Sequence, residues 1–105
     1  VIRPGLGISL LQDSYARRIG VKGVVVVDVS RGSEADKDGI QGIARNRYGE
    51  IYLQDIIVGI YDHKITSYDY LFNALENYRI GETVTLVLVM NDRQRKVRFT
   101  LVGAD

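Results

Sequence analysis

The chain contains no cysteine. A disulfide framework, a cysteine-based zinc site and a thiol nucleophile are therefore all excluded. Histidine is nearly as scarce, because His63 is the only one, and a zinc site would need carboxylates such as Asp62 as further ligands. We expect no metal and no cofactor. A single histidine, with no serine in a Gly-x-Ser-x-Gly setting, also argues against a self-contained serine hydrolase.

Net charge and long apolar runs are scarce as well. The 14 basic and 13 acidic residues leave a formal charge of +1, so we expect no strong field for nucleic acid or a membrane surface. No apolar run approaches the roughly 20 residues that a bilayer span needs, and no signal peptide is visible. We expect no membrane insertion. The length fits a single domain covering residues 1–105, and a start at Val1 predicts a piece excised from a longer protein.

What the chain does hold is a series of strand-forming segments. Val24–Val29 is a β-branched run, and residues 55–60 and 83–89 are similar. Residues 96–102 alternate charged and apolar side chains. The polar residues 91–93 separate the last two segments, which predicts an antiparallel hairpin there.

Two helices are expected between these strands. A short one at residues 33–39 opens with a serine and ends at a glycine, which are typical helix boundaries. A longer one covers residues 67–78, with Thr66 and Asp69 as its capping box.

The longer helix carries two neighbouring apolar stripes. At about 100° per residue, Leu71, Leu75 and Tyr78 fall on one stripe, and Tyr68, Phe72 and Leu75 on the next. One interpretation is that Tyr68 and Phe72 only cover the margin of the core. The other is that Leu71 and Tyr78 face the core while Tyr68 and Phe72 line a groove.

A glycine-bounded loop, Gly5-Leu6-Gly7-Ile8, leads into a short strand at residues 8–11. Glycine leaves the backbone free to turn its N–H groups into one small space. Converging N–H groups capture anions, and the carboxylate at the end of a peptide is such an anion. The edge of the following strand could then pair with the rest of an extended peptide.

In this order the elements resemble a PDZ domain of the kind attached to trypsin-like HtrA/Deg serine proteases. Residues 3–8 (Arg-Pro-Gly-Leu-Gly-Ile) are similar to the Deg carboxylate-binding loop and its strand. Residues 32–40 resemble the family's Ser-Pro-Ala-x-x-Ala-Gly-Leu helix, and residues 53–57 resemble Leu-Gly-Asp-x-Ile. An insertion at residues 44–51 resembles an extension in Deg proteases of chloroplasts and some bacteria.

Three single residues and one turn depart from the family pattern, and the turn is Tyr61-Asp62-His63-Lys64 where Asn-Gly is more usual. Glu34 stands where proline is usual, Asp38 where alanine is usual, and Gln54 where glycine is usual. None of them touches residues 5–8, so the expectation of peptide binding stands.

The resemblance implies an α+β PDZ fold: a small, partly open antiparallel β-barrel or sandwich of five to six strands with two helices. It implies peptide capture by β-augmentation, for substrate recruitment, activation or oligomer assembly in protein quality control. The expected partners are C-terminal or unfolded segments of proteins, the parent protease domain and other subunits of a homo-oligomer. The catalytic triad of such a protease lies outside this chain. HtrA/Deg proteins also imply a location in the periplasm or thylakoid lumen.

The resemblance assigns site residues in two groups. The carboxylate-binding group is Gly5, Leu6, Gly7 and Ile8. The peptide groove is lined by Ser9, Leu10, Leu11, Tyr68, Phe72 and Leu75.

Two other interpretations remain open. One is an interaction-only PDZ domain from a non-protease scaffold or secretion protein. The other is a nucleic-acid-binding β domain, because residues 93–98 are basic and seven tyrosines could stack on bases. Strand alternation puts Arg95 and Arg98 on different faces, and charges on an edge hairpin are usually solvated. We therefore expect no nucleic-acid partner.

Overall fold

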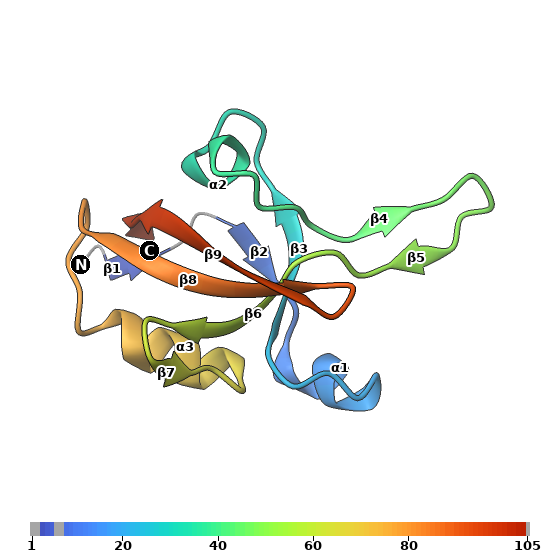
Figure 1. The fold of residues 1–105 in the computed structure, drawn as a ribbon, viewed down its shortest axis with the longest axis horizontal. Helices are drawn as coiled ribbons and strands as arrows, with labels where there is room; N and C mark the ends of the chain where they lie inside the picture. The colour runs from blue at the N-terminus through green and yellow to red at the C-terminus, as the bar shows by residue number, and fades with distance from the viewer. Residues whose placement is uncertain (1–2, 6–7, 105) are drawn as a thin grey trace.

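The computed structural model describes residues 3–5 and 8–104, and its centre is an antiparallel sheet (Figure 1). The strand order is β2-β3-β6-β8-β9, and β7 pairs with β6. The bounds are β2 (Ile8–Leu10), β3 (Val24–Val29), β6 (Ile56–Ile60), β7 (His63–Lys64), β8 (Thr83–Met90) and β9 (Arg93–Thr100). Two smaller ladders join β1 (Arg3–Gly5) to β10 (Val102–Ala104) and β4 (Ala44–Arg45) to β5 (Ile51–Tyr52). The expected α+β class and partly open antiparallel sheet are confirmed.

The described chain has three helices where two were expected. They are α1 (Asp13–Arg18), α2 (Glu34–Lys37) and α3 (Tyr68–Leu75). Helix α1 connects β2 to β3 and was not predicted. In Figure 1, α2 and α3 lie on opposite sides of the long β8–β9 hairpin.

Helix α3 begins and ends differently from the prediction. The capping box of Thr66 and Asp69 is wrong, because Ser67 is the N-cap and its Oγ accepts a hydrogen bond from the backbone N–H of Tyr70 at 3.1 Å. The helix ends at Leu75. The chain then forms a tight turn, in which the N–H of Tyr78 donates to the carbonyl of Leu75 at 3.0 Å.

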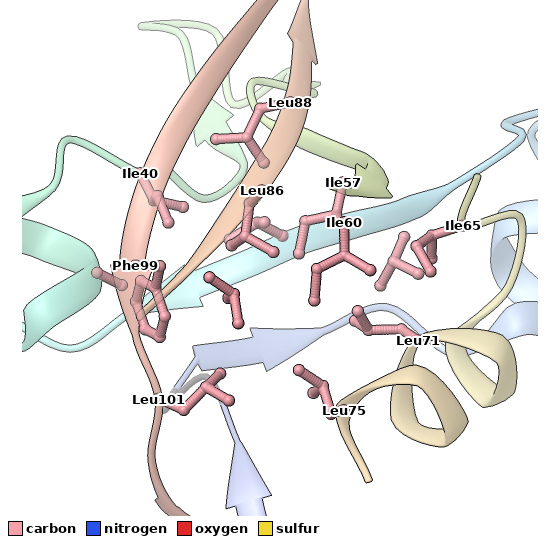
Figure 2. Packing of buried hydrophobic residues seen from close by; sticks show 14 residues of the cluster. Ile40, Ile57, Ile60, Ile65, Leu71, Leu75, Leu86, Leu88, Phe99 and Leu101 are labelled. Atoms are coloured by element: carbon pink, nitrogen blue, oxygen red, sulfur yellow. The ribbon is translucent and has the colours of Figure 1, made fainter. Parts of the chain in front are cut away.

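The core lies between the sheet and α3 (Figure 2). Leu71 and Leu75 of α3 are fully buried, at 0% and 1% exposed. The predicted core-facing side of the helix is therefore confirmed for Leu71. The sheet and its connections contribute Ile40, Ile57, Ile60, Ile65, Leu86, Leu88, Phe99 and Leu101 to the same cluster.

The β8–β9 hairpin matches its prediction at the turn. Asn91 and Asp92 both have positive φ, 52° and 64°, as a two-residue type I′ turn requires. The prediction of a strand over residues 96–102 is wrong in its bounds. The ladder with β8 already begins at Arg93, and Leu101 separates β9 from β10.

A buried ion pair holds β9 to the loop before β6. Asp55, placed inside the predicted strand, lies just before β6 and is 0% exposed. The Nη1 and Nη2 atoms of Arg95 donate to its two carboxylate oxygens at 2.6 and 2.8 Å. The N–H of Gln41 donates to the second oxygen at 2.7 Å, and Nη2 of Arg95 also reaches the carbonyl of Gly39 at 3.0 Å. Both carboxylate oxygens are thus satisfied, as burial of a charge demands.

The insertion at residues 44–51 forms a hairpin arm, β4–β5, that projects away from the sheet (Figure 1). At its base the N–H of Ile43 bonds to the carbonyl of Val27 at 3.1 Å, and Nε2 of Gln54 donates to the carbonyl of Gly42 at 2.7 Å. A Cβ on Gly42 would lie 2.4 Å from the oxygen of Val27. Only glycine fits this close approach.

Candidate functional site

Strand β2 offers one free edge of the sheet. It lies at the end of the strand order and, among the residues that the structure describes, pairs with β3 alone, with Ile8 opposite Val29 and Ser9 opposite Asp28. Ser9 is exposed, whereas Ile8 and Leu10 are partly buried. Exposure thus alternates along β2, and a strand edge of this kind can accept another strand.

Helix α3 presents an aromatic pair beside its buried face. Tyr68 and Phe72 are partly buried, and their ring centroids lie 4.5 Å apart at an angle of 42°. Both pack against the hydrophobic cluster that Ile8 and Leu10 also contact. Apolar side chains of β2 and α3 that the sequence assigned to the peptide site therefore pack against the same hydrophobic cluster.

The other predicted groove residues differ in their surroundings. Leu75 is 1% exposed and belongs to the core itself, so Tyr68 and Phe72 are the more accessible of the three predicted groove residues on α3. Leu11 is partly buried, and its N–H bonds to the carbonyl of Val25 at 2.9 Å, which extends the pairing with β3.

The loop predicted to bind a carboxylate is described only at its two ends. Gly5 ends β1 and lies opposite Val102, and Ile8 begins β2. Leu6 and Gly7 lie outside the described residues. Carboxylate binding by these N–H groups stays a prediction.

A contact that the sequence did not reveal joins α1 to the first turn of α3. Oδ1 of Asp13 accepts a hydrogen bond from the backbone N–H of Tyr68 at 2.7 Å, across 55 residues of sequence. A small pocket lies beside this contact and is lined by residues of both helices, Arg17 and Asp69 among them. Asp13 begins α1, a helix in which only Ala16 is buried, so no periodic signal pointed to it.

A second aromatic pair joins the residue after β6 to the segment that follows α3. The rings of Tyr61 and Tyr78 lie 5.9 Å apart, and the hydroxyl of Tyr61 donates to the carbonyl of Thr83 at 3.0 Å. Partial burial, followed by the nearby Tyr61 and Glu82, raises the pKa of Tyr78 above its ordinary value. Tyr78 therefore stays neutral at physiological pH and acts as a packing residue.

The residues considered for metal binding or nucleic-acid binding have other surroundings. His63 is exposed in β7, and within residues 3–5 and 8–104 no three His, Cys, Asp or Glu side chains gather as a metal site. Arg95 of the basic segment is committed to Asp55, while Arg93 and Arg98 are exposed. In the part of the chain that the structure describes, no helix has the length and apolarity to cross a membrane.

Comparisons with known proteins agree with this arrangement. The family model of the PDZ domain matches residues 4–101. Protease Do-like 1, chloroplastic, of Arabidopsis thaliana is 34% identical over 101 residues, an alignment that covers 96% of this chain and 23% of that protein. The chain thus spans about a quarter of the length of this curated relative.

Solved structures share the fold. The HtrA-type protease AlgW with decapeptide superposes with a TM-score of 0.69 at 22% identity, over 100% of this chain and 30% of that chain. The HtrA3 PDZ domain bound to a phage-derived ligand (FGRWV) gives 0.68 at 18% identity, over 99% of this chain and 89% of that chain.

Proposed function

The chain belongs to the PDZ domain family, and we propose that it is the peptide-binding module of an HtrA/Deg-type serine protease. The single observation that supports binding here is that the edge strand β2 and the Tyr68–Phe72 pair pack on one hydrophobic cluster. Two of the structurally similar proteins are named as peptide complexes. Residues 1–105 are then one recognition domain of a longer protein.

The proposed mode of binding is β-augmentation. An extended peptide adds antiparallel to β2, and its terminal carboxylate accepts hydrogen bonds from the N–H groups of Leu6, Gly7 and Ile8. Its last side chain enters a pocket between β2 and α3 beside Phe72. Because the side chains of Tyr68 and Phe72 are both bulky, the pocket suits a small or medium apolar residue at the peptide terminus.

Within the parent protein this module would capture substrate termini, relay activation or join subunits of an oligomer. The peptide hydrolysis itself belongs to the parent's protease domain, outside this chain. The relative's name places that protein in the chloroplast. For this chain we propose an extracytoplasmic location, in the thylakoid lumen or the periplasm.

The test is titration of fluorescent peptides that end in a free apolar residue, followed by amidation of the best binder. Amidation removes the charge that the loop would hold. Hydrogen bonds to a charged group contribute roughly 1.5–3 kcal/mol, so the amide should bind at least tenfold more weakly. Equal binding of the acid and the amide would show that the loop is not the site, and absence of binding by both would reject the peptide function.

A further inference from the structure

The first turn of α3 is held by two side chains, one of which comes from far away in the sequence. Ser67 caps the helix locally through the N–H of Tyr70. Asp13 accepts the N–H of Tyr68 at 2.7 Å from a partly buried position. The first N–H groups of a helix have no partner within the helix, so Asp13 supplies one of the required acceptors from a different element.

Asp13 also lies where the β2 edge ends. The pairing of the β2 segment with β3 continues to Leu11, and Gln12 then starts α1 by accepting the N–H groups of Tyr15 and Ala16. The chain thus leaves the sheet after Leu11, and two residues later the side chain of Asp13 contacts the first turn of α3. The contact between Asp13 and Tyr68 thus ties the segment that follows β2 to the first turn of α3.

The geometry of a strand tells which part of a bound peptide reaches that end. A peptide antiparallel to β2, with its carboxylate near Ile8, has its upstream residues near Leu11 and Asp13. Successive side chains of a strand alternate between faces, so the last and the third-from-last side chains point the same way, toward α3. The third-from-last side chain therefore meets the Tyr68 ring.

We infer, on the basis of the proposed peptide function, that Asp13 is a positioning residue for this groove. Its carboxylate fixes the first turn of α3 at a set distance from the end of β2. It thereby places the Tyr68 ring and determines how strongly the domain selects the third side chain from the peptide terminus. Asp13 acts through Tyr68 and need not touch the peptide.

The experiment uses two peptides that differ only in that third residue, glycine in one and leucine in the other. Dissociation constants are measured for the wild type, Asp13→Ala, Asp13→Asn and Asp69→Ala, together with thermal melts. The wild type should prefer leucine by roughly tenfold, the ratio that a packed apolar side chain typically supplies. Asp13→Ala should reduce the ratio to about twofold or less, because α3 loses the anchor that places Tyr68.

Two variants serve as matched controls. Asp13→Asn keeps an oxygen that can accept the Tyr68 N–H, so it should retain most of the preference. Asp69 is exposed and lines the same small pocket, so Asp69→Ala should leave the ratio unchanged. If Asp13→Ala does not fold, Asp13→Glu moves the acceptor by one methylene and should also lower the ratio.

The outcomes separate the inference from the function on which it rests. A ratio that survives Asp13→Ala or Asp13→Glu, even with a lower melting temperature, makes Asp13 a purely structural cap. A wild type that binds both peptides equally shows that Tyr68 does not contact this side chain, and also overturns the inference. A wild type that binds neither peptide overturns the peptide function itself.

Discussion

Asp55 shows how a single residue can hold three segments together. Its carboxylate is fully buried and accepts from Arg95 and from the N–H of Gln41, while Arg95 also reaches Gly39 at the end of the α2 turn. A buried charge is tolerated only when it is paired and hydrogen-bonded. The pair therefore stabilises the connection between the base of the hairpin arm and β9.

The losses of stability from removing the two members of this pair should not add. Arg95→Ala leaves Asp55 buried without its cation, a loss of about 3–5 kcal/mol for a broken buried pair. We expect the lower end of that range, because the Arg95 side chain is 37% exposed. Urea unfolding of Arg95→Ala, Asp55→Ala and the double variant measures this in a mutant cycle.

The double variant should lose clearly less than the sum of the two single losses. Strict additivity would mean that the two side chains do not stabilise one another. Arg98→Ala is the matched control, since Arg98 is an exposed arginine on the same strand, and it should change the free energy of unfolding by less than about 0.5 kcal/mol.

The same residues mark the limit of prediction at this scale. The sequence indicated Asp55 as part of a recognisable motif, but its partner Arg95 lies 40 residues away and was assigned to a solvated basic run. Asp13 and Tyr68 are separated even further. Long-range partners of polar side chains leave no periodic trace, whereas apolar positions on one element do.

At the scale of elements, segments with a repeated apolar pattern were predicted best. Val24–Val29 has the same bounds in the structure as in the sequence analysis. Helix α1 escaped prediction because Ala16 is its only buried residue and its N-cap, Gln12, makes no capping hydrogen bond through its side chain. A helix without a stripe or a side-chain cap gives neither of the usual signals.

Neighbouring residues of α3 should have separate effects on stability and binding. Leu71 is fully buried, so Leu71→Ala should lower the free energy of unfolding by about 2–5 kcal/mol. Phe72 is only partly buried, so Phe72→Ala should lower it less, and the enlarged pocket should favour larger terminal residues. Thermal melts and peptide titrations of both variants check the two effects.

The reverse pattern would contradict this placement of the groove. Suppose that Phe72→Ala unfolds the domain while Leu71→Ala changes neither stability nor binding. The stripe that contains Tyr68 and Phe72 would then face the core instead of the stripe that contains Leu71. Such a rotation corresponds to about 100° around the helix axis.

The hairpin arm should be dispensable for folding. Tyr48, Ile51 and Tyr52 are 78%, 54% and 51% exposed, and a two-stranded hairpin is only marginally stable by itself. Replacing residues 45–51 with Asn-Gly should close a two-residue turn between Ala44 and Tyr52, which are partners in the ladder.

Urea unfolding should find the shortened domain within about 1 kcal/mol of the wild type. Its peptide affinity should also be unchanged, since the anchors Gly42, Ile43 and Gln54 all remain. A domain that unfolds without the arm would show that the arm contributes to the core.

At the scale of the molecule, the two edges of the central sheet are chemically different. One edge is the short β2, flanked by partly buried Ile8 and Leu10. The other is β9, which carries exposed Arg93, Lys96 and Arg98. Charged side chains on an edge strand discourage pairing with another chain. This difference favours β2 as the edge for the proposed strand addition.

Two measurements on the whole domain test whether a peptide adds to the sheet at β2. In amide NMR spectra, an added peptide should shift the signals of Ile8, Leu10 and Tyr68 and leave those of β9 in place. Peptides N-methylated at one position each should then show a two-residue pattern, because alternate amides of an added strand donate to the sheet and the others point away. Methylation of an amide that donates to the sheet should abolish binding, and methylation of an amide that points away should be tolerated. Shifts concentrated on β9, or an affinity that falls equally with every methyl group, would mean that the peptide does not extend the sheet at β2.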